Sequence, residues 1–149
     1  MGDYTTSDKT EDFDNLSTER NKALILHVVE RGWHPSVIRE FCAPDYVIHF
    51  GRDTLTRDNL IEFMEMLHSA LMDLRFTADD IIAEGDKVVT RWTAIGTHQG
   101  VFQGIQPTGN QVVFTGITIS RIKNGVIVED WEEVDQLNFT QQFGVFPDV

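Results

Sequence analysis

The 149-residue chain contains a single cysteine, Cys42. One thiol cannot form an internal disulfide, and it cannot supply a zinc cluster of cysteines. The sequence also has no uninterrupted apolar stretch of about 18 residues, the length that a membrane-spanning helix needs. We therefore expect a chain that folds without disulfides, structural zinc or membrane spans.

Basic residues are scarce as well. Twelve Lys and Arg stand against 24 Asp and Glu, which gives a formal net charge of −12 at pH 7. A charge of this sign repels phosphate backbones and anionic lipid surfaces. Neither a nucleic acid nor a membrane is expected as a partner.

Several signatures of catalytic sites are missing. The sequence has no Walker loop, no dinucleotide-binding glycine motif, no nucleophile elbow and no two histidines at metal-ligand spacing. We expect no cofactor and no metal ion. The chemistry that remains is cofactor-free acid–base catalysis, or the binding of a small ligand.

Length and composition fit one domain. The chain is 41% hydrophobic and 24% charged, as in an ordinary soluble globular protein, and it is too short for two cores of normal size. Residues 1–15 are acidic and poor in large apolar side chains, which predicts a mobile tail before a single domain over residues 16–149. This start also lacks the basic and apolar segments of a signal peptide, so a cytoplasmic location is expected.

Helical patterns fill the first half of the sequence and strand patterns the second. The expected helices run from Ser17 to Gly32, over 35–41, and from Thr56 to about residue 72. The expected strands cover residues 74–83, 87–97, 111–122 and 126–134. Helices followed by an antiparallel meander predict an α+β domain with the helices on one face of a curved sheet.

The Asn124-Gly125 turn predicts the register of the last two strands. With these residues as a two-residue loop, Phe114 lies opposite Asp135. One face of the hairpin is then expected to line a cleft under the helices, and it carries Phe114, Gly116, Thr118, Ser120, Ile122, Ile127, Glu129, Trp131, Glu133 and Asp135. A β-bulge that shifts this register is the alternative.

The opposite face of the hairpin is expected to be largely β-branched and aliphatic, with Arg121, Asp130 and Glu132 among these residues. An antiparallel sheet covered on one side normally turns a polar face to water. We therefore expect a partner subunit to cover this face, most simply in a symmetric homodimer. Covering loops would serve the same purpose.

Asp135 is the first candidate for catalysis. Apolar neighbours on the predicted cleft face would favour exchange of its proton near neutral pH. From spacing alone, a solvated carboxylate at a strand end is the simpler interpretation, because most Asp residues are exposed. His49 and His98 are the other candidate catalytic residues, as acid–base groups or hydrogen-bond donors. A buried structural histidine at 49 and a turn cap at 98 are the alternatives.

Five residues are candidates for contact with a substrate: Trp131, Arg91, Trp92, Phe114 and Glu133. The two tryptophans and Phe114 would form apolar pocket walls. Arg91 would donate hydrogen bonds, unless it pairs with a carboxylate or faces water.

Several stretches of the sequence carry a resemblance to a known family. They are GTHQGVFQGIQPTGN at 96–110, FTGITISRIKNGVIVEDWEEVD at 114–135 and QQFGV at 141–145, with YVIH at 46–49 upstream. Over about residues 17–146 the chain resembles the SnoaL-like polyketide (ester) cyclases of the nuclear-transport-factor-like superfamily.

The resemblance implies a cone-shaped, curved mixed or antiparallel sheet wrapped around the N-terminal helices, a cystatin-like α+β barrel that is usually a homodimer. It further implies that the Trp-x-x-x-Asp element, here Trp131 and Asp135, carries an acid–base aspartate. In the characterised cyclases this aspartate promotes a ring-closing intramolecular aldol condensation without metal or cofactor. The expected ligand is a small, apolar, carbonyl-containing compound in a deep pocket.

Other functions on this fold stay open. The domain could bind a small ligand without chemistry, or it could resemble a dehydratase or an epoxide hydrolase. The Arg-x-Asp pair of a limonene-type epoxide hydrolase is missing at Arg91-Trp92-Thr93, and only two tyrosines are present.

Overall fold

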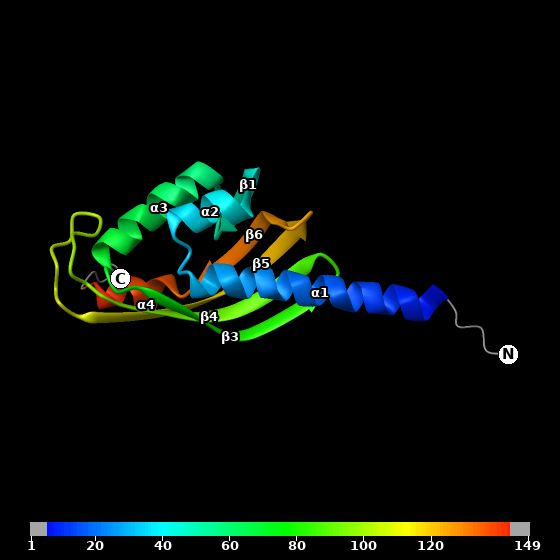
Figure 1. Cartoon of the computed structure of the whole chain (residues 1–149). Helices are drawn as coiled ribbons and strands as arrows, with labels where there is room; N and C mark the ends of the chain where they lie inside the picture. The colour runs from blue at the N-terminus through cyan, green and yellow to red at the C-terminus, as the bar shows by residue number, and fades with distance from the viewer. Residues whose placement is uncertain (1–5, 144–149) are drawn as a thin grey trace.

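The computed structural model describes the backbone of residues 6–143 and the side chains of residues 16–143. Within this range the chain forms helices and strands in the following order (Figure 1): α1 (Thr6–Glu30), α2 (Pro35–Phe41), β1 (Cys42–Phe50), β2 (Asp53–Thr56), α3 (Arg57–Ala70), β3 (Arg75–Glu84), β4 (Lys87–Thr97), β5 (Gln111–Lys123), β6 (Val126–Val134) and α4 (Gln136–Gln142).

The strands form one curved six-stranded sheet in the order β2-β1-β6-β5-β4-β3. Strands β1 and β6 run parallel, and every other neighbouring pair is antiparallel. The expected mixed, curved α+β sheet is confirmed. It stays open, because β2 and β3 are edge strands and do not pair with each other.

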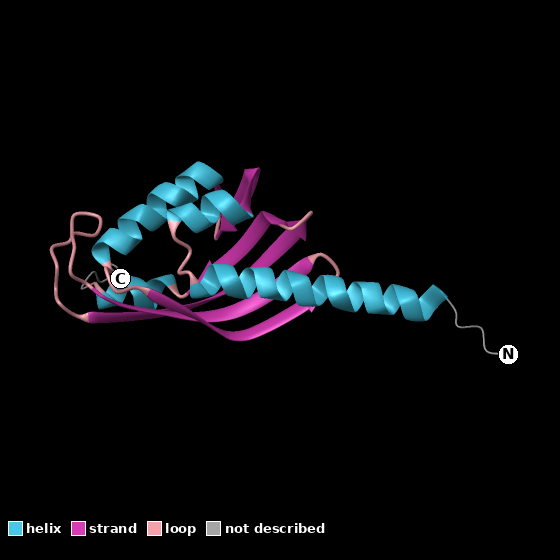
Figure 2. Ribbon diagram, in the orientation of Figure 1, coloured by secondary structure: helices cyan, strands magenta, loops and turns pink. Residues whose placement is uncertain are grey.

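The first three helices lie on the concave side of the sheet (Figure 2). Helix α1 packs against β3 and β4, α3 packs against β1, β2 and α2, and α4 lies against β5. One hydrophobic core fills the space between helices and sheet, with fully buried residues from α1, α2, β1, β4, β5 and β6. The curvature therefore turns one face of each central strand toward the interior.

Most of the predicted elements agree with the structure. The bounds of α2, β4 and β6 are as predicted, and Thr56 caps α3 through a reciprocal capping box with Asn59. Helix α1, however, begins at Thr6 and not at Ser17, so residues 6–15, which were assigned to a tail, are helical. Its first turns extend beyond the sheet (Figure 1).

Three elements were not predicted: the strands β1 and β2 and the helix α4. Strand β1 is important for the site because it pairs in parallel with β6.

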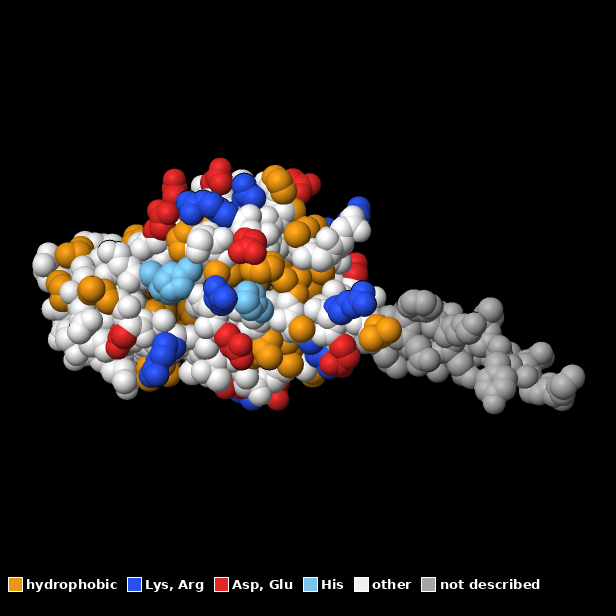
Figure 3. Space-filling view, in the orientation of Figure 1, with side chains coloured by type: hydrophobic (Ala, Val, Ile, Leu, Met, Phe, Trp, Pro, Cys, Tyr) orange, Lys and Arg blue, Asp and Glu red, His pale blue; other side chains and the backbone are white. Residues whose placement is uncertain are grey.

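The described surface shows no large region of a single charge in the orientation of Figure 3, where acidic, basic and apolar side chains are interspersed. No helix in the described part of the chain is long and apolar enough to span a membrane.

Candidate functional site

A β-bulge in the β5–β6 hairpin determines which side chains reach the concave side of the sheet. The pairing next to the turn follows the prediction as far as Ile122, and the register then shifts. Beyond the shift, Ser120 lies opposite Asp130 and Thr118 lies opposite Glu132. A shift of one residue exchanges the two faces of a strand. The register predicted from the turn is therefore wrong for the rest of β6.

Glu132 is the carboxylate that this shift brings to the interior. Thr118 Oγ1 donates a hydrogen bond to Glu132 Oε1 over 3.1 Å, and Trp92 Nε1 donates to the same Thr118 oxygen over 2.9 Å. Burial, assisted by the charge of Asp130, raises the pKa of Glu132 to about 7, while the hydrogen bond from Thr118 acts in the opposite direction. Glu132 can therefore take up and release a proton near neutral pH.

Asp130 lies two residues earlier on the same face of β6 and is fully buried. The hydroxyl of Tyr46 on β1 donates a hydrogen bond to Asp130 Oδ2 over 2.5 Å. Burial raises the pKa of Asp130 to about 6, against the opposing effect of the nearby Ser120 hydroxyl and of the hydrogen bond from Tyr46. Burial and the charge of Asp130 raise the pKa of Tyr46, so its hydroxyl remains a donor.

Both carboxyl groups face a cavity with aromatic walls. An outer hollow of about 230 Å³ adjoins an inner one of about 40 Å³, and the two share Met64, Phe76, Trp92 and Glu132. Asp130 lines only the inner hollow. Seven aromatic side chains line the outer hollow: Phe50, Phe63, Phe76, Trp92, Phe102, Phe114 and Phe139. We call the two hollows together the aromatic cavity.

Five of the seven rings are joined by ring contacts: Phe76, Trp92, Phe114, Phe139 and Phe102. Trp92 packs edge-on against Phe114 with ring centroids 5.9 Å apart, and Phe114 packs in the same way against Phe139 at 4.8 Å. The exposed amides of Gln103 and Gln136 lie on the outer hollow. The cavity therefore combines an apolar wall, a polar rim and a carboxylate inside, which is the usual composition of a small-molecule site.

Two of the predicted substrate contacts, Trp92 and Phe114, line this cavity. Trp131 and Glu133 do not; the bulge turns them to the convex face, where they line an open hollow with Ile117. Their placement on the cleft face was wrong for this reason. Contact of any of these residues with a substrate stays a prediction.

Asp135 is exposed and lies just beyond β6, where its backbone N–H donates a hydrogen bond to the carbonyl oxygen of Thr115 on β5 over 3.1 Å. Its Oδ1 accepts a hydrogen bond from the backbone N–H of Asn138 over 3.2 Å, so it is the N-cap of α4. The pairing with Phe114 that was predicted for it is wrong. In the structure Asp135 caps α4, and its catalytic role stays a prediction.

The remaining predicted site residues lie outside the aromatic cavity. On the convex face, His49 bonds Glu129 over 2.7 Å and stacks on Trp131, while the exposed Arg91 pairs with Asp80 over 2.7 Å. His98 is fully buried and interacts with Thr108. These positions fit the alternative predictions, which were pairing with a carboxylate for Arg91 and a cap of the turn for His98.

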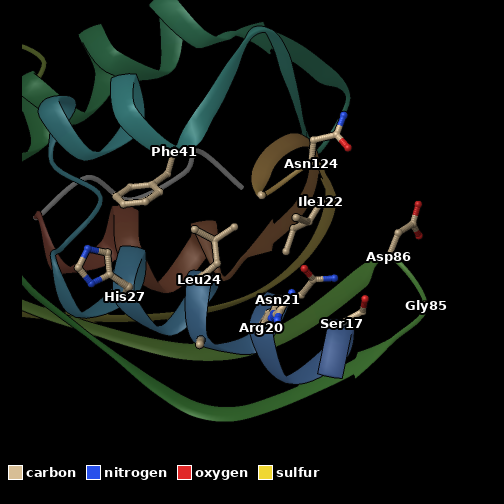
Figure 4. A pocket seen from close by; sticks show the side chains of 12 residues that line it. Ser17, Arg20, Asn21, Leu24, His27, Phe41, Gly85, Asp86, Ile122 and Asn124 are labelled. Carbon is tan, nitrogen blue, oxygen red and sulfur yellow. The ribbon is translucent and has the colours of Figure 1, made fainter. Parts of the chain in front are cut away.

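A second hollow lies at the opposite end of the strands (Figure 4). This open groove of about 900 Å³ is bounded by α1 and by the β3–β4 and β5–β6 turns. Leu24, Phe41 and Ile122 form its apolar part, and Asp86 stands exposed at its edge. No carboxyl group among its described lining residues is buried, so the groove lacks the acid–base group that the aromatic cavity has.

Reasoning from the sequence missed Glu132, Asp130 and Tyr46. The signal that could have found the two carboxylates is their spacing, because Asp130, Glu132 and Val134 alternate along β6 and must share a face. Tyr46 had no such signal, since its role depends on the unpredicted parallel pairing of β1 with β6.

Comparisons with known proteins agree with this architecture. AclR from Streptomyces galilaeus, a proposed hydroxylase, is 31% identical over 89% of this chain and 85% of its own, with a TM-score of 0.79. IdmH from Streptomyces antibioticus, a proposed polyketide cyclase, is 30% identical over 86% of this chain and 99% of its own, with a TM-score of 0.70. A search of curated proteins finds no match.

A third structure, a proposed SnoaL-like polyketide cyclase from Jannaschia sp. CCS1, shares the fold at 23% identity, with a TM-score of 0.77 over 87% of this chain and 95% of its own. The family model for SnoaL-like polyketide cyclases matches residues 23–143, which include the helices α2, α3 and α4 and the whole sheet. The chain therefore belongs to the SnoaL-like polyketide cyclase family.

Proposed function

We propose that this chain is a cofactor-independent acid–base enzyme that cyclises or isomerises an apolar carbonyl compound in the aromatic cavity. The observation that supports this most directly is the position of Glu132. Its pKa of about 7 and its contact with an apolar, ring-lined space give a proton acceptor matched to neutral pH.

The chemistry follows from these groups. Ionised Glu132 would remove the proton on the carbon next to a carbonyl group, and the electron pair of the broken C–H bond would form an enolate. In a cyclisation the enolate carbon attacks a second carbonyl of the same molecule, and protonated Glu132 returns its proton to the new alkoxide. In an isomerisation the proton returns to a different carbon. Aromatic walls that hold the reacting carbons close together would lower the barrier by several kcal/mol.

Asp135 is the competing candidate for the same proton transfer, on the resemblance of the Trp131–Asp135 element to the family pattern. Its exposed position and its bond to the N-terminus of α4 favour Glu132 instead. The two assignments predict opposite results for the variants Glu132→Gln and Asp135→Asn.

Deuterium exchange tests the proposal without knowledge of the natural substrate. The bicyclic ketone 2-tetralone has acidic protons beside its carbonyl, and NMR in D₂O follows their replacement. We expect exchange above the buffer rate for the wild-type chain, a loss of roughly 100-fold or more in Glu132→Gln, and near-wild-type exchange in Asp135→Asn. The control is Glu133→Gln, which alters the adjacent carboxylate on the convex face.

The results separate the alternatives. Loss of exchange in Asp135→Asn alone would return the role to Asp135. No exchange in the wild type, together with thermal stabilisation by 2-tetralone, would indicate a ligand-binding domain without this chemistry.

Hydroxylation is a second candidate, favoured by the similarity to AclR. Proton removal by Glu132 would again be the first step; one atom of O₂ would then enter the substrate, and a reductant supplied from solution would give the two electrons that convert the other atom to water. Consumption of dissolved O₂ with a turned-over carbonyl substrate would distinguish this candidate from cyclisation.

We also propose a homodimer formed through the convex face of the sheet. Its apolar patch consists of Val113, Ile117, Ile119 and Trp131, and Ile117 is 48% exposed. Isolated apolar patches of this kind on a sheet are commonly covered by a second subunit.

Sedimentation at micromolar concentration should show a dimer for the wild type. Ile117→Lys should sediment as a monomer, because it places a charge inside the proposed interface. The control Met72→Lys changes a more accessible apolar side chain, 71% exposed, outside the sheet. A monomeric wild type would contradict the proposal.

A further inference from the structure

The aromatic cavity has an unusual charge balance. Two carboxyl groups, those of Asp130 and Glu132, face it, and no Lys, Arg or His is among its described lining residues. Thr118 and Tyr46 supply neutral hydrogen-bond donors to these carboxyls, not charge. Glu132 also borders the convex hollow that His49 and Lys87 line, but the ion pairs of these two residues are with Glu129 and Asp86. No ion pair among the described residues therefore joins a cation to either carboxyl of the cavity.

The aromatic walls of the cavity also favour a positively charged ligand. Aromatic rings carry negative charge on their faces and attract cations, with Trp the strongest. Trp92 and Phe76 line both hollows, with ring centroids 5.4 Å apart and planes tilted by 58°. Anionic groups such as carboxylates or phosphates are repelled by this arrangement. A positively charged nitrogen group is favoured by the rings and by the carboxylates together.

We propose that the ligand of the aromatic cavity carries a positively charged alkylammonium group, which lies among the aromatic rings beside Glu132. This inference rests on the proposed function in one respect, since it places the substrate in the same cavity. It adds the chemical class: a cationic carbonyl compound, apolar apart from the carbonyl and a protonated or quaternary amine, and not an anionic one.

The proposal has a consequence for the proton-transfer step. An ammonium group beside Glu132 stabilises the ionised carboxylate and lowers the pKa that burial raises. Binding of the ligand would therefore release a proton and leave Glu132 in the form that accepts the next one.

The test compares two ligands of the same shape. Benzyltrimethylammonium keeps its charge at every pH, and neopentylbenzene is its neutral carbon counterpart. We expect the ammonium compound to bind at least tenfold more tightly than the neutral one at pH 8. This preference should fall as the pH is lowered from 8 to 5, because Glu132 becomes protonated. Tryptophan fluorescence, to which Trp92 contributes, measures both affinities.

Variants at adjacent positions provide the control. Glu132→Gln should abolish most of the charge preference while neopentylbenzene still binds, and Glu133→Gln should leave the preference unchanged. Thermal melting of each variant checks that it is folded.

Three results would overturn the inference. If both ligands bind equally, or if the neutral one binds more tightly, the cavity has no preference for cations, and the proposed function stands without it. If the preference is unchanged in Glu132→Gln, the cation binds elsewhere. If neither ligand binds, the aromatic cavity is not a ligand site, and the proposed function fails with the inference.

Discussion

Glu132→Gln should stabilise the folded chain by ~3 kcal/mol at pH 8 and change its stability little at pH 4.5. The rise in the pKa of Glu132 from 4.5 to about 7 is a cost of ~3 kcal/mol for ionising the carboxyl in the folded state. A glutamine has no such cost, and its amide oxygen can still accept the hydrogen bond from Thr118.

The sign of this effect follows from proton linkage. Because the folded-state pKa lies above the unfolded-state value, the folded chain binds more protons between about pH 4.5 and 7, and its stability falls as the pH rises through this window. Asp130, with a pKa raised from 3.8 to about 6, contributes in the same direction over a slightly lower window. The wild type should thus be less stable at pH 8 than at pH 5, as far as these two groups determine it.

Urea unfolding at pH 4.5, 6 and 8, at one protein concentration, measures the effect. The control Glu133→Gln, on the convex face, should change the free energy of unfolding by less than ~0.5 kcal/mol at each pH. A stabilisation by Glu132→Gln that is equal at all three values would show that Glu132 does not titrate in this range.

The secondary structure of this chain follows largely from local signals. Proline at the start of α2, the Thr56 cap of α3 and the Asn124-Gly125 turn each act over a few residues, so the sequence alone predicts them. Strand β1 is different. Its parallel pairing with β6 joins segments some 80 residues apart, which no local pattern reports.

The candidate site depends on a single backbone feature. The turn at Asn124-Gly125 fixes the first pairs correctly, and the bulge next to Ile122 then reverses the faces of β6. Without the bulge, Trp131 would lie on the interior face of β6 and Glu132 on the convex face. The alternation of side chains along a strand does not reveal a bulge. Phe114 on β5 and Trp92 on β4 were therefore placed correctly, whereas Trp131, Glu133 and Asp135, which follow the bulge, were not.

Burial of two carboxylates is also hard to predict from composition. Asp and Glu are rarely buried without a cation, and the reasonable expectation for Asp130 and Glu132 is the solvent face. Their inward position costs stability, as the raised pKa values show. Buried carboxylates that lower the stability of the fold are candidates for function. The bulge buries these two, and it is therefore the backbone feature on which the proposed chemistry depends.

Gly116→Ala should lower the free energy of unfolding by ~2–3 kcal/mol and impair ligand binding in the aromatic cavity. Gly116 lies opposite Trp92 in the β4–β5 pairing, and the indole ring covers its Cα. A Cβ at this position would overlap Trp92 Cζ2 and lie only 2.8 Å from the backbone oxygen of Glu133. The backbone cannot move away without disturbing β6, so overpacking of this kind is expected to cost a few kcal/mol.

Two comparisons make the prediction specific. Thr115→Ala, at the exposed neighbouring position, should have little effect on unfolding or on binding. In a Trp92→Leu background the cost of Gly116→Ala should fall by about half, because the contact with the indole is gone and the contact with the Glu133 oxygen remains. Urea unfolding of the wild type, the two single variants and the double variant gives the coupling energy between positions 92 and 116. Fluorescence titration with benzyltrimethylammonium measures whether the cavity of Gly116→Ala still binds this ligand. A Gly116→Ala chain as stable as the wild type would show that Trp92 does not lie against Gly116, and the wall of the cavity would then have to be placed elsewhere.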